Sequence, residues 1–196
     1  GLAQTGKGKT AAFGLPLITL LSENSGRPSP KTVRALILAP TRELASQIVE
    51  NLKDYTKGTP IKVALVVGGQ SINVQSKRLE NGIDILVATP GRLIDLMDRR
   101  ALTLKESHFL VLDEADQMLD MGFIHALRQI ATHLPEQRQT MLFSATMPKL
   151  MNEIANTYLK SPKRIQVSPP GKAADKVTQV VHFIAKTEKQ SLLIEL

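Results

Sequence analysis

Short runs of apolar residues alternate along the chain with segments in which apolar residues recur every three or four positions. The runs have the length and β-branched content of strands, and the segments between them have the spacing of one helical face. One such helix carries Leu44, Ile48 and Leu52 and ends before Gly58, and another ends before Pro135. The predicted strands are residues 33–39, 61–67, 83–88, 109–112, 140–143 and 164–167.

The strand runs are continuously apolar, which predicts burial on both faces. We therefore expect an α/β fold with a parallel sheet and helices on both faces. Residues 1–167 are interpreted as one domain. Residues 168–176, which contain Pro169, Pro170 and Gly171, are interpreted as a linker before a new strand at 177–185 and a helix from Glu188, the start of a second unit within 177–196.

Composition narrows the class of protein. The 196 residues are 22% charged, with apolar runs far too short to span a bilayer, so we expect a folded domain and no membrane segment. The absence of cysteine excludes disulfides and thiolate metal sites, and the start resembles no secretory signal, so we expect a cytoplasmic protein. The net charge of +7 favours polyanionic partners such as nucleic acid, although many proteins without such partners are equally basic.

In open parallel sheets, ligands bind beyond the carboxyl ends of the strands. The residues that follow five of the runs should therefore share one edge. They are Pro-Thr-Arg-Glu-Leu-Ala (40–45), Gly-Gly (68–69), Thr-Pro-Gly-Arg (89–92), Asp-Glu-Ala-Asp (113–116) and Ser-Ala-Thr (144–146).

A candidate phosphate-binding loop lies near the amino end. It follows the pattern Gly-x-x-x-x-Gly-Lys-Ser/Thr, with alanine in place of the first glycine. In such a loop the glycine amides turn towards phosphate, the lysine meets the β and γ phosphates, and the hydroxyl meets Mg²⁺. The alternative is a chance Gly-Lys-Thr turn. The loop residues are Ala3, Gln4, Thr5, Gly6, Lys7, Gly8, Lys9 and Thr10.

Two carboxylates follow the strand at 109–112. Asp113 stands where this fold holds the Mg²⁺ of a nucleotide, opposite Thr10, and Glu114 is placed to orient or deprotonate the attacking water. In the alternative interpretation, the acidic cluster is only a helix N-terminus, with Asp116 complementing the helix dipole.

The other strand ends carry groups that bind phosphate oxygens without reading bases. Each has a simpler explanation, since Thr41 fits a helix N-cap and the glycines fit plain turns. Along one edge, together, they favour a track for a sugar-phosphate backbone. The candidates are Thr41, Arg42, Gly69, Thr89 and Arg92.

With these motifs in this order, the chain resembles the first RecA-like domain of DEAD-box RNA helicases, which are P-loop NTPases, and most closely the bacterial RhlE-type members. The resemblance implies ATP and Mg²⁺ as cofactors, with Lys9, Asp113 and Glu114 in hydrolysis. It implies that Asp116, Ser144 and Thr146 couple nucleotide state to strand separation. It also implies a monomer that unwinds RNA locally, gripping single-stranded or partly duplex RNA by its backbone with little sequence preference.

The chain departs from the family pattern in two ways. Lys7 replaces a small hydroxyl residue, which makes nucleotide affinity less certain. The resemblance also implies a strand and an adenine-reading glutamine motif before Gly1, and an arginine finger in a second RecA-like domain beyond Leu196. Such an arginine contributes about 10³ to 10⁵ in rate in related hydrolases. We therefore expect this segment alone to have little turnover and no unwinding.

Two other functions stay open from the residues. One is a nucleic-acid-binding module without catalysis. The other is a P-loop ATPase unrelated to nucleic acid, although the chain has neither the Asn-Lys-x-Asp segment of GTPases nor the Leu-Ser-Gly-Gly-Gln segment of transporter ATPases. Coupling between RNA affinity and bound ATP separates an enzyme from a passive binder.

Overall fold

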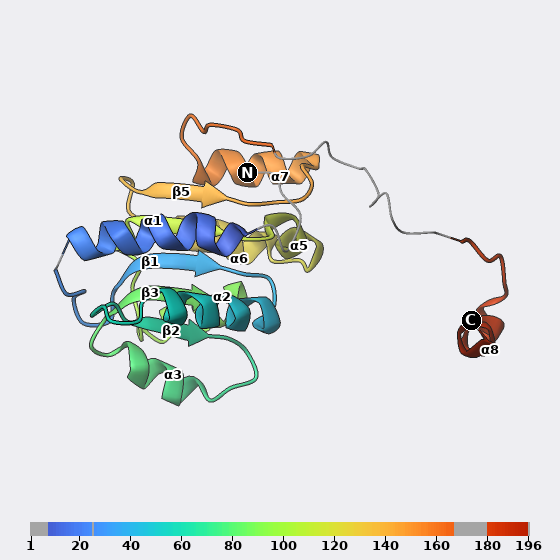
Figure 1. Cartoon of the computed structure of the whole chain (residues 1–196), viewed down its shortest axis with the longest axis horizontal. Coiled ribbons are helices and arrows are strands. Elements are labelled where there is room, and N and C mark those ends of the chain that lie inside the picture. The colour runs from blue at the N-terminus through green and yellow to red at the C-terminus, as the bar shows by residue number, and fades with distance from the viewer. Residues whose placement is uncertain (1–7, 25, 167–179, 196) are drawn as a thin grey trace.

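The computed structural model describes residues 8–24, 26–166 and 180–195. Its centre is a five-stranded sheet in the order β2-β3-β1-β4-β5, in which every adjacent pair is parallel. Figure 1 views the sheet through the helices in front of it, and the arrows labelled there all point the same way. The strands are β1 (Val33–Leu38), β2 (Val63–Val66), β3 (Ile83–Ala88), β4 (Phe109–Leu112) and β5 (Gln139–Leu142).

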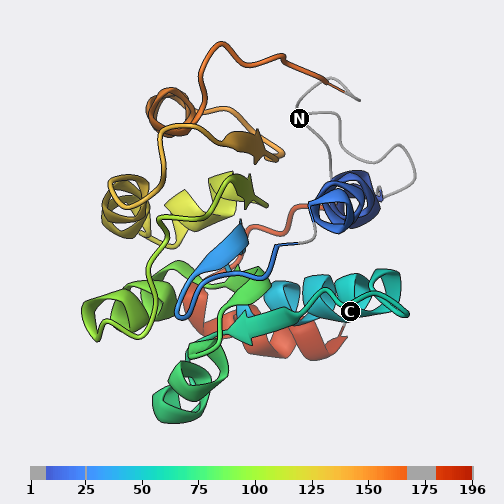
Figure 2. The ribbon, with the colours of Figure 1, turned by 90° about the vertical axis from the view of Figure 1, so that its left-hand side faces the viewer.

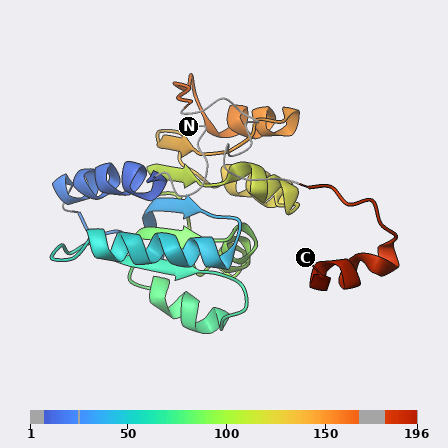
Figure 3. The same ribbon diagram turned by 45° about the vertical axis from the view of Figure 1, so that its right-hand side comes forward.

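Helices cover both faces of this sheet, as Figures 2 and 3 show. One face packs against α1 (Lys9–Glu23) and α2 (Arg42–Tyr55). The other face packs against α3 (Ile72–Leu79), α4 (Pro90–Asp98), α5 (Ala115–Asp120), α6 (Ile124–Ala131) and α7 (Lys149–Tyr158). The expected α/β class with a parallel sheet between two helical layers is therefore confirmed.

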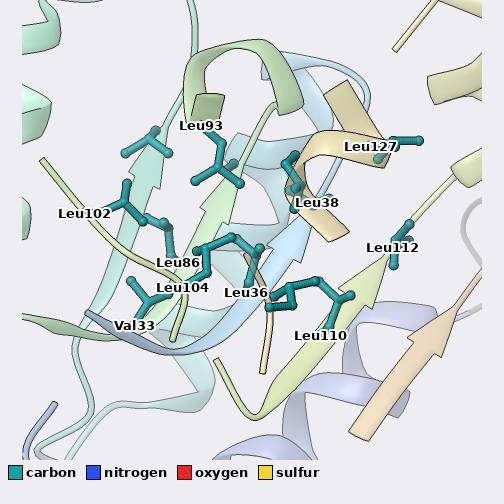
Figure 4. Packing of buried hydrophobic residues seen from close by; sticks show 14 of the residues in the cluster. Val33, Leu36, Leu38, Leu86, Leu93, Leu102, Leu104, Leu110, Leu112 and Leu127 are labelled. Carbon is teal, nitrogen blue, oxygen red and sulfur yellow. The ribbon is translucent and has the colours of Figure 1, made fainter. Parts of the chain in front are cut away.

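Burial along the strands explains the apolar runs. All six residues of β3 and five of the six in β1 are buried, because both strands lie inside the sheet. Within β1, Leu36 and Leu38 join the core under α4 to α7 (Figure 4), while Ala35 and Ile37 join the core under α1 and α2. The edge strands β2 and β5 are only partly buried, which fits their weaker apolar pattern.

Two predicted strands near the carboxyl end are wrong in the described residues. Residues 164–166 contain only an isolated bridge at Gln166, and 180–185 contain no strand. Their apolar side chains face solvent, with Ile165 66% and Phe183 96% exposed, and a strand without a packed partner is unstable in water. The helix expected from Glu188 is confirmed as a 3₁₀ turn, η1 (Lys186–Glu188), followed by α8 (Lys189–Glu195).

The predicted linker at 168–176 lies outside the described residues. In the part of the chain that is described, no helix is both long and apolar enough to cross a membrane.

Candidate functional site

The carboxyl ends of the strands meet at one edge of the sheet, as predicted. The residue after each of the strands β1, β3, β4 and β5 donates its backbone N–H to the neighbouring strand, which holds the motif segments in register. These bonds run from Ala39 to Ala88, from Thr89 to Val66, from Asp113 to Leu38 and from Phe143 to Leu112.

Lys9 meets the acidic pair at this edge. Gly8 precedes α1 with a φ of 73°, a left-handed conformation that glycine adopts without strain, and the helix then begins at Lys9. The Lys9 Nζ lies 3.2 Å from Asp113 Oδ1 and 4.0 Å from Glu114 Oε1, and Lys9 is 9% exposed. The predicted convergence of the lysine and the acidic pair is therefore confirmed. Thr10 is half-buried in the first turn of α1, and the loop residues 3–7 lie outside the described part.

Two opposing influences act on the pKa of the Asp113 carboxyl. Burial raises the pKa of its carboxyl, and the positive charge of Lys9 opposes this without cancelling it. Its Oδ1 also accepts a hydrogen bond from the Glu114 backbone N–H. Such a carboxylate gains from a nearby cation, and Lys9 is the cation now beside it.

No group of three or more possible metal-ligating side chains exists among the described residues. Proteins usually bind Mg²⁺ through one or two carboxylates together with substrate phosphates and water. Asp113 and the hydroxyl of Thr10 are the residues present that suit this arrangement.

Glu114 adopts a backbone conformation that is rare for a residue with a side chain. Its φ of 50° and ψ of 52° are left-handed, at the residue that precedes α5. Strain of this kind costs about 1–3 kcal/mol and persists where the surrounding structure enforces it, often at functional sites. The side chain keeps 19% of its area exposed, so it remains accessible to a solvent molecule beside Asp113.

Phe143 links the two parts of this centre. Its ring packs against Phe13 of α1 with 5.7 Å between ring centroids, and its carbonyl accepts the backbone N–H of Ala115 at 3.0 Å. Phe13 is fully buried. The helix that carries Lys9 and the segment that carries Asp113 and Glu114 are therefore fixed to the same residue.

The segment after Phe143 is bound to Asp116. One carboxylate oxygen, Oδ2, accepts from Ala145 N at 3.2 Å, Thr146 N at 2.9 Å and Thr146 Oγ1 at 2.8 Å. Partial burial alone would raise the pKa of Asp116, but hydrogen bonds from Thr146 and Ser144 outweigh it and hold the pKa below its ordinary value. The residues expected to couple two states are thus in direct contact.

A second cluster gathers around the loop at residues 68–70, after β2. Arg42 Nη1 donates to the Gly68 carbonyl at 3.4 Å, and Arg92 Nη1 donates to the Gln70 carbonyl at 2.8 Å. Gly69 has a φ of 77°, and a Cβ added there would lie 2.2 Å from Arg42 Nη1. The structure therefore places Arg42, Gly69 and Arg92 at the edge expected from the sequence, and the hydrogen bonds from the two arginines to loop carbonyls are new.

The two threonines of the proposed track have local roles as well. Thr41 is the N-cap of α2, and its side chain accepts from Leu44 N at 3.2 Å, which is the simpler explanation considered from the sequence. Thr89 precedes α4 and is buried, with 8% of its area exposed. Both lie at the correct edge, but among the described residues neither side chain is hydrogen-bonded to the loop at 68–70.

The sequence analysis missed Gln75. This residue of α3 is 1% exposed, and its amide bonds both backbone groups of Val67. The available signal was its position, because Ile72, Gln75 and Leu79 have the spacing of one helical face. A polar residue on an otherwise apolar face needs a buried partner.

A cavity of about 730 Å³ runs along the outer edge of β5 and reaches Lys9 and Ala12 of α1. Asp113 and Glu114 do not line it. We therefore locate the candidate site by the contact between Lys9 and Asp113 and not by this cavity.

Comparisons with known proteins agree with this geometry. The family model described as DEAD/DEAH box helicase matches residues 1–154. The chain is 44% identical over 189 residues to the DEAD-box ATP-dependent RNA helicase CshA of Streptococcus pneumoniae, covering 96% of this chain but 35% of that protein. The chain thus spans about a third of the length of this curated relative.

Two solved structures are similar. The yeast DEAD-box splicing factor Prp28 is 41% identical with a TM-score of 0.72, over 82% of this chain and 39% of that one. A hypothetical ATP-dependent RNA helicase from Sulfolobus tokodaii is 35% identical with the same TM-score of 0.72, over 82% of this chain and 45% of that one. The finer resemblance to RhlE-type members stays a prediction. With this sheet, this meeting of Lys9 with the acidic pair and a family match over most of its length, the chain belongs to the DEAD/DEAH box helicases.

Proposed function

We propose that the chain is the ATP-binding half of an RNA-dependent ATPase that unwinds RNA duplexes locally. The observation that carries this proposal is the 3.2 Å contact between Lys9 Nζ and Asp113 Oδ1. It joins the end of the phosphate-binding motif to the acidic motif at the sheet edge where nucleotides bind in this class of fold.

ATP with Mg²⁺ is the proposed cofactor. The glycine-rich segment at residues 3–8 would cradle the phosphates, and Lys9 would exchange its contact with Asp113 for the β and γ phosphates. Thr10 and Asp113 would hold Mg²⁺, partly through water. Bound there, the ion neutralises charge on the transferred phosphoryl group.

Glu114 is the proposed acceptor of the proton from the attacking water. It follows Asp113 directly at the start of α5, and its side chain keeps 19% of its area exposed. The Lys9 Nζ lies 4.0 Å from its Oε1, so the carboxylate stands within the group formed by Lys9 and Asp113.

Single-stranded or partly duplex RNA is the proposed substrate, held by its backbone with little sequence preference. Arg42 and Arg92 support this, because each guanidinium has five N–H donors and gives one of them to a loop carbonyl. Arg92 Nε also lies 3.9 Å from Asp95 Oδ2. Thr41, Gly69 and Thr89 lie at the same sheet edge and complete the proposed track. Asp116, Ser144 and Thr146 would transmit nucleotide state to RNA.

We further propose that a second RecA-like domain of the same gene product closes over this edge. The name of the S. pneumoniae relative, an RNA helicase of which this chain covers 35%, supports that proposal. A monomer in the cytoplasm is the proposed working form, and the lack of cysteine supports a reducing compartment.

RNA affinity measured with and without an ATP analogue and Mg²⁺ tests the proposal on the full-length gene product. Tighter RNA binding with nucleotide, together with RNA-stimulated ATP hydrolysis, is the expected result. Equal RNA affinity in both conditions would instead indicate a passive nucleic-acid-binding module. Nucleotide hydrolysis without any response to RNA would indicate a P-loop ATPase unrelated to nucleic acid.

A further inference from the structure

Gln75 forms an unusual pair of hydrogen bonds with the backbone of Val67. Its Oε1 accepts the Val67 N–H at 3.2 Å, and its Nε2 donates to the Val67 carbonyl at 3.0 Å. Both residues are 1% exposed. The amide of a glutamine is the uncharged side chain that can offer one acceptor and one donor at this reach, so it satisfies both backbone groups at once.

Val67 lies between an edge strand and the loop at residues 68–70. It comes directly after β2, an edge strand of the sheet, and directly before Gly68 and Gly69. At an edge strand one side has no neighbouring strand to pair with. The side chain of Gln75 takes the place of that neighbour at the last residue before the loop.

The loop that follows is bound by two arginines from other elements. Arg42, from α2, donates to the Gly68 carbonyl, and Arg92, from α4, donates to the Gln70 carbonyl. Together with Gln75, from α3, three side chains bind carbonyls of residues 67, 68 and 70. The orientation of these carbonyls therefore also fixes where the two guanidinium groups point.

We propose that Gln75 is a positioning residue for RNA binding: by holding Val67, it sets the loop at residues 68–70 whose carbonyls aim Arg42 and Arg92 at the RNA backbone. This inference rests on the proposed function, because it assumes that these two arginines contact phosphate. Gln75 itself is buried and touches no RNA.

Loss of the amide has a specific consequence. Without it, the Val67 N–H and carbonyl are buried with no partner from Gln75, and the backbone must move to reach water. The loop at 68–70 then no longer presents its carbonyls in the observed arrangement. The nucleotide contacts depend on Lys9 and Asp113 in other elements, so they should be unaffected.

Gln75→Met tests this proposal because methionine keeps the length of the side chain and removes both hydrogen-bonding groups. Leu79→Ala is the matched control: Leu79 is also a buried residue of α3, at 1% exposure, and lacks any polar group for Val67. Both variants weaken the packing of α3. Gln75→Met alone removes the anchor of the loop.

The measurements are the affinity of the full-length gene product for a labelled single-stranded RNA, with an ATP analogue and Mg²⁺, and the salt dependence of that affinity. We expect Gln75→Met to weaken RNA binding about tenfold and to lower the slope of log affinity against log salt by about 1 to 2, since each lost phosphate contact lowers that slope by roughly one. The KM for RNA in ATP hydrolysis should rise while kcat at saturating RNA and nucleotide affinity stay near wild type.

Three other results would overturn the proposal in distinguishable ways. Wild-type RNA affinity and slope in Gln75→Met would mean that the loop does not need the anchor. Equal weakening in Gln75→Met and Leu79→Ala would mean that Gln75 acts only through the stability of α3. Absence of RNA binding by the wild-type protein would remove the proposed function itself, and the inference with it.

Discussion

The Lys9 Nζ is 3.2 Å from Asp113 Oδ1, and both side chains are more than nine-tenths buried. A buried carboxylate is costly unless it is paired, and here the residue that pairs with it belongs to the predicted phosphate-binding loop. When nucleotide takes Lys9 from Asp113, the carboxylate needs another cation. The proposed Mg²⁺ fills that need, so nucleotide and metal should bind together.

Lys9→Ala should lower ATP affinity by about 10- to 100-fold and abolish ATP-dependent activity, since hydrogen bonds to charged groups contribute roughly 1.5–3 kcal/mol each. Calorimetric titration with an ATP analogue measures the first effect. Lys53→Ala, on an exposed position of α2, is the control and should bind like wild type. Unchanged affinity in Lys9→Ala would exclude Lys9 from the nucleotide site.

The same variant should change how stability depends on pH. Burial already raises the pKa of Asp113 above its ordinary value of 3.8, and Lys9 opposes that rise. In Lys9→Ala, the pKa of Asp113 in the folded protein rises further. The folded variant therefore holds the proton on Asp113 more tightly than its unfolded chain does. The stability deficit of Lys9→Ala should therefore be small near pH 4 and grow as pH rises through the folded-state pKa. Urea unfolding of both proteins across this range measures the difference, and a deficit independent of pH would contradict it.

Glu114→Gln should reduce ATP turnover by about 10² to 10⁴, the usual contribution of a general base, while ATP affinity is kept. The amide has the shape of the carboxylate but cannot accept the proton from water. Nucleotide and RNA should consequently stay bound together, which a filter-binding assay with labelled ATP and RNA detects. Glu50→Gln, at an exposed position of α2, serves as the control. Normal turnover in Glu114→Gln would remove Glu114 from this role.

Asp116→Ala should release the segment at residues 144–146 from α5, because one carboxylate oxygen accepts all three hydrogen bonds from Ala145 and Thr146. Faster amide hydrogen exchange at Ala145 and Thr146 is the expected result. Asp120→Ala, an exposed position of the same helix, should leave both amides protected. ATP hydrolysis should continue in Asp116→Ala while unwinding is lost if this contact couples the two.

Acid should also release residues 144–146 in the wild-type protein, because protonation removes the charge of Asp116. The pH at which this happens follows from the pKa of Asp116, which lies below its ordinary 3.8. The contact contributes its full stability above that ordinary value. It is lost only as pH falls through the lowered folded-state pKa. Protection of the Thr146 amide, corrected for intrinsic exchange, should therefore persist at pH 4 and fall below it. Loss of protection near neutral pH would contradict this account.

The sequence predicted those parts of the fold that depend on pattern alone. Continuously apolar runs at β1 and β3 indicated burial on both faces, and parallel strands require their carboxyl ends to share one edge. The meeting of Lys9 with Asp113 follows from these two facts. The strand prediction failed where the apolar run has no neighbouring strand. Phe183 belongs to such a run and is exposed, because a strand is stable only beside another strand.

Contacts between side chains and backbone carbonyls could not be predicted. The hydrogen bonds from Arg42 to Gly68 and from Arg92 to Gln70 depend on which strands are neighbours, and the order β2-β3-β1-β4-β5 is not written in any local pattern. The position of Gln75 on an apolar helical face signalled a buried partner, but not which group that partner is. Its partner, Val67, is a main-chain group, and every residue type except proline carries one with an N–H.

Gly69→Ala should weaken RNA binding while its neighbour tolerates the same change. Gly69 has a left-handed φ of 77°, and a Cβ there would lie 2.2 Å from Arg42 Nη1, so alanine introduces backbone strain and displaces the guanidinium. The strain should cost about 1–2 kcal/mol of stability. Gly68→Ala is the matched control, since a Cβ at Gly68 meets nothing within 4 Å and its φ is not left-handed. We expect RNA affinity to fall several-fold in Gly69→Ala only, with ATP affinity unchanged in both, because Lys9 and Asp113 do not contact this loop. Equal RNA affinities for the two variants would show that RNA binding does not depend on the position of the Arg42 guanidinium.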